Sequence, residues 1–152
     1  MLSVVFGPRD IVFTSEDANY TVPVGVETLA AMISGDPPSP EHLINAIGLV
    51  MDHIEDVIRE VPSAAWDDRI ECTGVGLATI AAVEVGGTAT HPFELTREAA
   101  EEVFRTVATE SAVDRARNPG LPAAEVHQVV GVCCAVVAVL RALHAPMVIL
   151  IQ

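Results

Sequence analysis

The last third of the chain carries the feature that most restricts how it can fold. After the turn-forming residues 118–122, residues 123–143 form an almost unbroken apolar segment, and residues 148–151 are a second aliphatic run. A helix that is apolar on more than one face must be covered by other elements around most of its circumference. A short aliphatic run is typical of a buried strand in a sheet covered on both faces. A helix followed by a strand therefore predicts an α/β core.

The same segment is too short to predict a membrane span. Residues 129–140 are about a dozen uninterrupted apolar residues, whereas a bilayer requires roughly 20. Arg141, His144 and Pro146 then interrupt the apolar run. We therefore expect no membrane partner.

Composition limits both the core and the choice of partners. The 152 residues predict one domain, 1–152, with an aliphatic core, because 51% of them are hydrophobic but only 4% are aromatic. The net charge is −13, from 21 acidic and 8 basic residues. This charge argues against nucleic-acid binding, which depends on neutralising phosphates. It also repels a polyanionic substrate unless a local basic patch, a metal ion or a partner compensates.

Three cysteines, Cys72, Cys133 and Cys134, lie in apolar surroundings without the spacing of metal ligands. Their odd count and the adjacent pair predict reduced, buried thiols of a cytoplasmic protein. The N-terminal residues lack the basic region and apolar run of a signal peptide.

Two groups of side chains contain metal-ligand types, and both have a simpler interpretation. His127 is one candidate together with a cysteine, but a single His near a helix start is more often a capping or packing residue. The other group is Asp52, His53, Glu55 and Asp56. It fits a solvated helix face, so we predict no metal ligand.

Short apolar runs and turn residues predict the order of the elements. Strands are expected at residues 2–6, 10–14, 20–24, 69–72 and 148–151. Helices are expected at residues 26–33, 40–61, 77–85, 96–109 and 123–143. Three antiparallel strands followed by crossover-linked ones are typical of a ribonuclease-H-like half domain of the actin-like ATPase superfamily. We therefore predict an α/β fold with a mixed five-stranded sheet flanked by helices.

Five stretches, in order and in register, resemble one family. They are residues 22–27 (VPVGVE), 35–41 (GDPPSPE), 93–98 (FELTRE), 118–121 (NPGL) and 126–151. Together they resemble the second lobe of the exopolyphosphatase and guanosine pentaphosphate phosphatase family (Ppx/GppA). The resemblance implies a ligand in a cleft between two lobes, with the general base, a Glu, on the first lobe. That first lobe has no counterpart in this sequence.

The family's phosphate loop, DIGGGSTE, corresponds to the turn between the first two predicted strands. A phosphate loop needs glycines for close approach and amides as donors. Here only Gly7 remains, and Pro8 removes an amide donor. In the resemblance, Asp10 falls where the family has its loop Glu, and Arg9 is an alternative phosphate contact. We favour an ordinary hairpin turn over a shrunken phosphate loop.

The family's second loop, a strand-turn-helix junction with the sequence GGT, corresponds to residues 72–79. Gly74 and Gly76 are candidates for an anion cradle there, and the alternative is a turn that needs glycine but no ligand. A literal GGT at residues 86–88 is interpreted as coincidence. Gly131 matches the family's helix glycine, which permits close helix approach.

Three hypotheses for function stay open. The first is a degenerate, non-catalytic binding or regulatory module, acting as a homodimer or with the missing first lobe, and able to bind a phosphate-containing ligand. The alternative is one lobe of a Mg²⁺-dependent phosphohydrolase of polyphosphate or guanosine pentaphosphate. The third is a structural dimerisation domain without a ligand. We predict no catalytic residue within this chain, and no cofactor except Mg²⁺ if the chain is catalytic.

Overall fold

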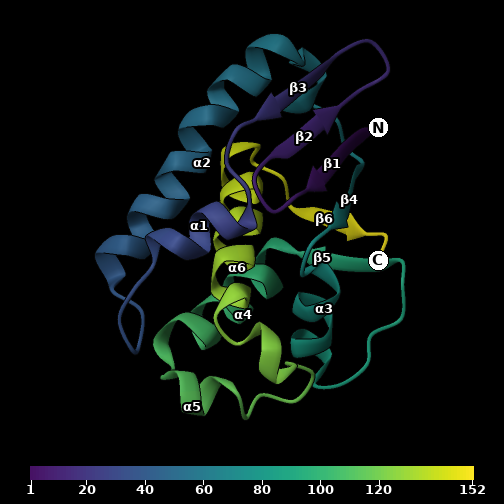
Figure 1. The fold of residues 1–152 in the computed structure, drawn as a ribbon. Coiled ribbons are helices and arrows are strands. Elements are labelled where there is room, and N and C mark those ends of the chain that lie inside the picture. Colours follow the sequence, from purple (N-terminus) through teal and green to yellow (C-terminus); the bar gives the residue numbers. More distant parts are fainter.

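A computed structural model describes residues 1–152 as a mixed α/β fold built on one six-stranded sheet (Figure 1). The strand order is β3-β2-β1-β4-β6-β5. Strands β1 (Leu2–Phe6), β2 (Ile11–Thr14) and β3 (Asn19–Val22) form the predicted antiparallel meander. Strand β4 (Ile70–Gly74) lies parallel to both β1 and β6 (Met147–Leu150).

The sixth strand, β5 (Phe93–Thr96), corrects the predicted count of five. It pairs antiparallel with β6 at the edge of the sheet, where Glu94 lies opposite Ile149. Only Leu95 of its four residues is buried. So short an edge strand carries too little alternation to be recognised from sequence, and Thr96 gives a competing helix-capping signal.

The helices divide into one buried helix and the helices that cover it. The bounds are α1 (Val26–Met32), α2 (Pro40–Glu60), α3 (Leu77–Val85), α4 (Arg97–Thr109), α5 (Ala112–Arg115) and α6 (Gln128–Ala142), with short 3₁₀ turns at Pro62–Ala65 and Ala123–Glu125. Helix α6 begins five residues later than predicted, because the first part of the apolar segment forms the 3₁₀ turn. Every residue of α6 between Val129 and Leu140 is buried, as predicted.

Helices α1, α2 and α4 surround α6 (Figure 1). The alternating burial of the side chains of β1 shows which face of the sheet the helices cover. Leu2, Val4 and Phe6 are buried, whereas Val5 points to the opposite face and is 43% exposed. Strand β1 is therefore open on one face, whereas consecutive residues Val148, Ile149 and Leu150 of β6 are all buried, as expected for a strand covered on both faces. No helix is both long and apolar enough to cross a membrane.

Candidate functional site

The two predicted loops lie side by side at one end of the sheet. Because β1 and β4 are parallel neighbours, Phe6 lies opposite Gly74 at the ends of the two strands. The amide of Val75 donates to the carbonyl of Phe6 over 2.9 Å. The β1–β2 turn, residues 7–10, and the β4–α3 turn, residues 75 and 76, therefore form one continuous edge.

The β1–β2 turn uses its carbonyls to cap α1. The amides of Val26 and Glu27, at the start of α1, donate to the carbonyls of Gly7 and Pro8 over 3.0 and 2.9 Å. The first amides of a helix normally need a partner from outside the helix, and they are often the donors that hold an anion. In this chain the turn itself satisfies them.

Close packing by protein atoms explains the glycines at this end of the molecule. A Cβ atom on Gly131 would lie 2.7 Å from the carbonyl oxygen of Val26 in α1, and one on Gly76 would lie 2.5 Å from a methyl group of Val132. A Cβ atom on Gly74 would clash with the backbone of β1. Gly74 and Gly76 also have φ values of 128° and 80°, which favour glycine. The assignment of these glycines to a ligand stays a prediction.

Arg9 and Asp10 keep free polar groups at the tip of the turn. Both residues are exposed, and Arg9 takes part in none of the ion pairs of the chain. The amides of Arg9 and Asp10 donate no hydrogen bond to another backbone group, whereas the amide of Gly7 donates to the carbonyl of Asp10 over 2.8 Å. The carboxylates of Asp10 and Glu27 oppose the single positive charge of Arg9. This edge therefore offers a few phosphate contacts with little net attraction for a polyanion.

His127 and the cysteines are placed in packed surroundings. The Nε2 atom of His127 lies 3.2 Å from the carbonyl oxygen of Ala30 in α1. Burial raises the pKa of Cys72 and of Cys134 to about 12, and it also raises the pKa of Cys133. These side chains therefore remain neutral thiols, which are poor nucleophiles and poor metal ligands.

No group of three or more His, Cys, Asp or Glu side chains is arranged to hold a metal ion. The cluster Asp52, His53, Glu55 and Asp56 lies on the outer part of α2, where Asp56 pairs with Arg59.

Sequence reasoning missed the buried arginine, Arg115. Its side chain is only 4% exposed and donates to the backbone carbonyls of Val107, Glu110 and Val126 over 2.8 to 2.9 Å. Burial lowers the pKa of Arg115. Arg115 thereby ties the end of α4 to the segment that leads into α6. In the sequence it stands in a short acidic-basic segment that gives no signal of burial.

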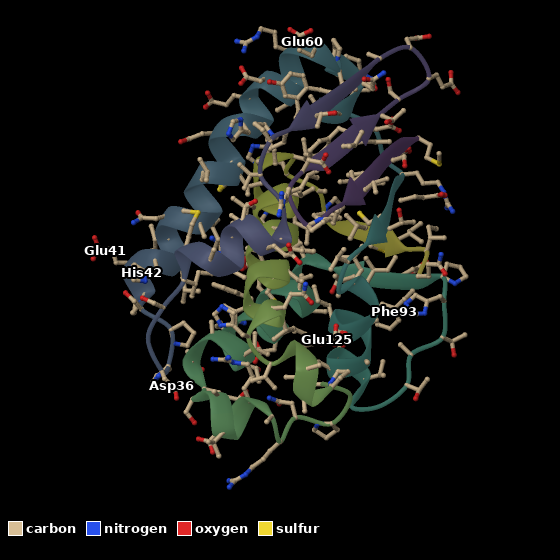
Figure 2. All side chains as sticks on the ribbon, in the orientation of Figure 1. Asp36, Glu41, His42, Glu60, Phe93 and Glu125 are labelled. Atoms are coloured by element: carbon tan, nitrogen blue, oxygen red, sulfur yellow. The ribbon has the colours of Figure 1, made fainter.

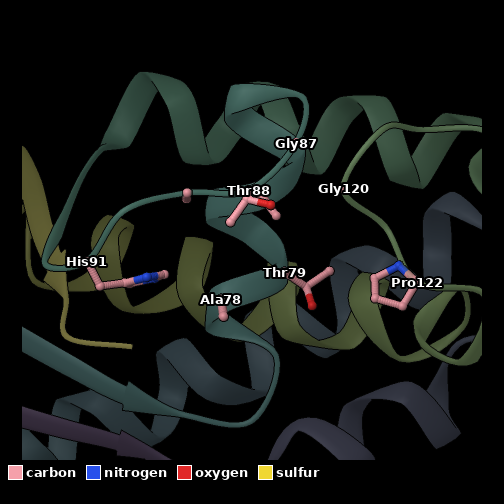
Figure 3. A pocket seen from close by; sticks show the side chains of 9 residues that line it. Ala78, Thr79, Gly87, Thr88, His91, Gly120 and Pro122 are labelled. Atoms are coloured by element: carbon pink, nitrogen blue, oxygen red, sulfur yellow. The ribbon is translucent and has the colours of Figure 1, made fainter.

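The literal GGT at residues 86–88 lies beyond α3 and away from the strand-to-helix junction. Two of its residues, Gly87 and Thr88, line a cavity of about 450 Å³ between α3 and the loop that follows it (Figure 3). Thr79 and His91 also line this cavity, and the Nε2 atom of His91 is buried without a hydrogen-bond partner. The hydroxyl of Thr79 donates to Glu125 over 2.7 Å. The junction after β4 is instead formed by Gly74 and Gly76, as predicted.

The chain is similar in fold to several proteins of known structure. No protein-family model and no curated protein matches the sequence. The Aquifex aeolicus Ppx/GppA phosphatase matches with a TM-score of 0.82 at 17% sequence identity, over 98% of this chain and 52% of that one. An exopolyphosphatase-like protein matches with a TM-score of 0.81 at 18% identity, over 93% and 49% of the two chains. An exopolyphosphatase from Cytophaga hutchinsonii matches with a TM-score of 0.74 at 12% identity, over 99% and 52%.

These matches define the class of fold. The chain spans about half the length of the solved structures that it matches. Its fold is similar to about half of each of these Ppx/GppA and exopolyphosphatase structures, which confirms the predicted half-domain fold.

Proposed function

We propose that this chain is a non-catalytic binding module built on the fold of one Ppx/GppA lobe. The observation that carries the proposal is the β1–β2 turn, whose carbonyls at Gly7 and Pro8 cap α1. A phosphate loop needs amide donors that face the ligand and room for the ligand beside them. This turn presents carbonyls to a helix and packs its backbone closely against Gly25.

The predicted ligand is a phosphate-containing molecule held weakly at the tip of the turn. The exposed guanidinium of Arg9 is the available donor, because the amides of Arg9 and Asp10 lie against Gly25. Gly74 and Gly76 line the neighbouring turn. Because the chain carries a net charge of −13, its overall charge repels a polyanion, and Arg9 is the positive charge at this edge.

We propose that this binding serves a regulatory role in the cytoplasm. The resemblance places the general base of the family on a first lobe, and the chain spans about half of the matched structures. A partner, either a second copy of this chain or a separate first lobe, would have to close the ligand site from the other side. Such a partner would also set which phosphate compound is bound.

The test is a titration of the purified chain with inorganic polyphosphate, guanosine pentaphosphate and ATP, each with Mg²⁺. We expect polyphosphate to raise the melting temperature without phosphate release, because a ligand that binds the native state stabilises it. Arg9→Ala should abolish the rise. Arg97→Ala, which removes another arginine without an ion pair, should retain it. Phosphate release by the chain alone would contradict the proposal, and no response to any compound would favour the structural dimerisation domain.

The second candidate is one half of a two-lobed phosphohydrolase. It is favoured by the length of the matched structures, which are about twice as long as this chain. The tagged chain should then copurify from its source cells with a polypeptide that carries the other lobe. The isolated pair should release phosphate from polyphosphate with Mg²⁺, whereas neither member should do so alone.

A further inference from the structure

An apolar groove lies between α2 and α4, on a part of the molecule that the proposed function does not use. It encloses about 420 Å³. Ile44, Gly48 and Met51 line it from α2, Phe104 lines it from α4, and Arg141 of α6 closes one part of its wall. We call it the α2–α4 groove.

The residues of α2 in the groove follow the spacing of one helix face. Positions 44, 48 and 51 are four and three residues apart, so their side chains neighbour one another on the surface. Ile44 is 70% exposed, although isoleucine is among the residues most often buried. The exposed apolar face is therefore continuous along the groove.

Gly48 has no structural reason within the chain. A Cβ atom at this position would meet no atom within 4 Å, and its φ is not positive. Glycine is unfavourable in the interior of a helix, and Gly48 is near the middle of the 21-residue α2. Alanine would fit at this position without a steric clash, so the fold itself does not require glycine. Without a side chain at Gly48, the groove is deeper at this point. A low floor lets the backbone of another helix approach closely.

The free charge beside the groove is negative. Glu41, Asp52 and Glu55 are exposed on α2 and form no ion pair or side-chain hydrogen bond. Glu55 follows Met51 by one helical turn on the same face. Glu41 stands at the start of the helix (Figure 2).

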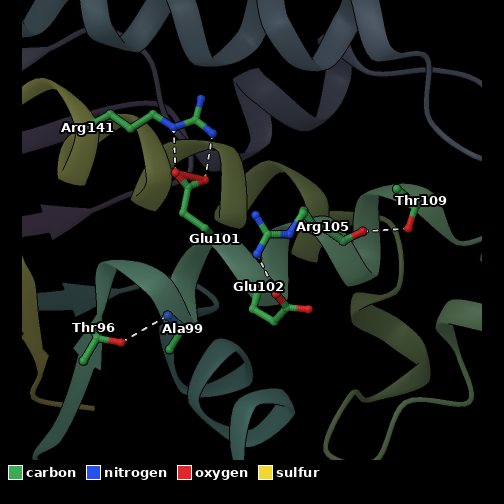
Figure 4. Close-up of polar contacts among 7 residues, drawn as sticks. All are labelled: Thr96, Ala99, Glu101, Glu102, Arg105, Thr109 and Arg141. Carbon is green, nitrogen blue, oxygen red and sulfur yellow. Dashed lines mark hydrogen bonds and ion pairs between the residues drawn. The ribbon is translucent and has the colours of Figure 1, made fainter.

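The opposite wall, by contrast, has its positive charges engaged. Arg141 donates to both carboxylate oxygens of Glu101 over 2.7 and 2.9 Å, and Arg105 donates to Glu102 over 2.5 Å (Figure 4). Arg59, the basic residue of α2 itself, pairs with Asp56. The free carboxylates Glu41, Asp52 and Glu55 are therefore left to pair with a cationic partner.

We propose that the α2–α4 groove is the docking site for an amphipathic helix of a basic partner protein. Such a helix lays apolar side chains at helical spacing into a hydrophobic groove, here onto Ile44, Met51 and Phe104. Its lysine or arginine side chains pair with the carboxylates of α2. A second copy of this chain is a poorer occupant, because each copy carries a charge of −13 and the same free carboxylates beside the groove.

The experiment uses two fluorescent synthetic peptides of about 18 residues, long enough to form a helix. Both have leucine at helical spacing on one face; the first has lysine at the flanking positions and the second has glutamate. Fluorescence anisotropy measures the binding of each peptide to the full chain. We expect the lysine peptide to bind and the glutamate peptide not to bind.

Three variants separate the groove from general attraction to an acidic protein. Gly48→Leu fills the floor of the groove while improving helix propensity, so it should fold normally and bind the lysine peptide about tenfold more weakly or worse. Ile44→Asp should weaken binding to a similar degree. Asn45→Leu adds the same leucine to an exposed position of α2 outside the groove and should bind as the wild type does.

Equal binding of the lysine peptide to the wild type and Gly48→Leu would overturn the proposal, as would an equal loss with Asn45→Leu. Sedimentation of the chain alone tests the other occupant. If the wild type dimerises and Gly48→Leu does not, the groove is the binding site for a second copy. That result would also overturn the proposal. A monomeric chain whose groove variants alone lose the peptide would support it.

Discussion

Two regions of this protein contain glycines for opposite reasons. At the end of the sheet, Gly74 and Gly131 have their side-chain positions filled by neighbouring backbone. In the α2–α4 groove, the position beside Gly48 is open. The sequence of the first region resembles the ligand loops of a family, yet its glycines are packed against protein atoms. The sequence of the second region shows no motif, yet its glycine faces open space that a partner could fill. The role of a glycine can therefore be inferred only when the structure shows whether its side-chain position is filled or open.

The comparison also has an energetic side. Glycine costs conformational entropy in the unfolded chain, and it is tolerated where no other residue fits. At Gly74 and Gly131 any larger residue must displace backbone. At Gly48 a larger residue should improve the isolated chain. Alanine substitutions in the two regions should therefore change stability with opposite signs.

The largest effect is expected for Gly74→Ala. The new Cβ atom would clash with the backbone of β1, and the φ of 128° is strained for any residue with a side chain. Overpacking and backbone strain together should lower the free energy of unfolding by about 3 to 5 kcal/mol. Denaturant unfolding followed by circular dichroism measures the loss. Gly87→Ala is the control, because no atom lies within 4 Å of its Cβ position and its φ is not positive.

Gly131→Ala should have the next largest effect. Its Cβ atom would lie 2.7 Å from the carbonyl oxygen of Val26 and 2.9 Å from the amide nitrogen of Ala30, so α1 must move away from α6. Overpacking of this kind should lower the free energy of unfolding by about 2 kcal/mol. The melting temperature provides the measurement. An unchanged value would show that the two helices separate without cost, and it would reopen Gly131 to a ligand role.

A smaller effect is expected for Glu101→Gln on the wall of the groove. The hydrogen bonds from Arg141 lower the pKa of Glu101 below its ordinary value of 4.5, although burial opposes the shift. A group with a depressed folded-state pKa stabilises the fold above its unfolded-state pKa, and this stabilisation is lost as the pH falls through the folded-state pKa. The variant should therefore lose about 1 kcal/mol at neutral pH.

The pH dependence provides the check on Glu101. The difference between Glu101→Gln and the wild type should shrink as the pH falls below 4.5, in urea unfolding experiments repeated across the acid range. Glu55→Gln, which removes a carboxylate without a partner, should show no comparable difference at neutral pH. A constant difference at all pH values would mean that the pair contributes through packing instead of charge.

The smallest effect, and the only gain, is expected for Gly48→Ala. Replacing an interior helix glycine whose side-chain position is open should raise the free energy of unfolding by about 1 kcal/mol. Thermal unfolding measures this difference. A loss of stability would mean that α2 needs the glycine for its own geometry, and it would remove the argument that the glycine serves a partner.

Much of the fold could be predicted because it depends on local pattern. The apolar period of α2, the proline at its first turn and the turn residues between β1, β2 and β3 all act over a few neighbouring positions. Strand β5 was missed because its partner, β6, is some fifty positions further along the chain, and the pairing gives four edge residues their extended conformation.

The candidate site could be predicted only in part. The residues of both loops were named and do lie together at the ends of β1 and β4. What the turn does with its carbonyls was not predictable, because the start of α1 reaches it only in the folded chain. Arg115 and the α2–α4 groove gave no signal either, since burial and exposure of single side chains depend on distant elements.

The sequence by itself determined the α/β class, the aliphatic core, the negative charge and the resemblance to one lobe of a two-lobed phosphatase. Composition and short-range periodicity carry these properties, so they are present in the unfolded chain as well. Only the tertiary structure decided which glycines are packed against backbone and which one faces open space. That distinction depends on contacts between residues far apart in the chain, such as Gly131 with Val26, and such contacts exist only once the chain has folded.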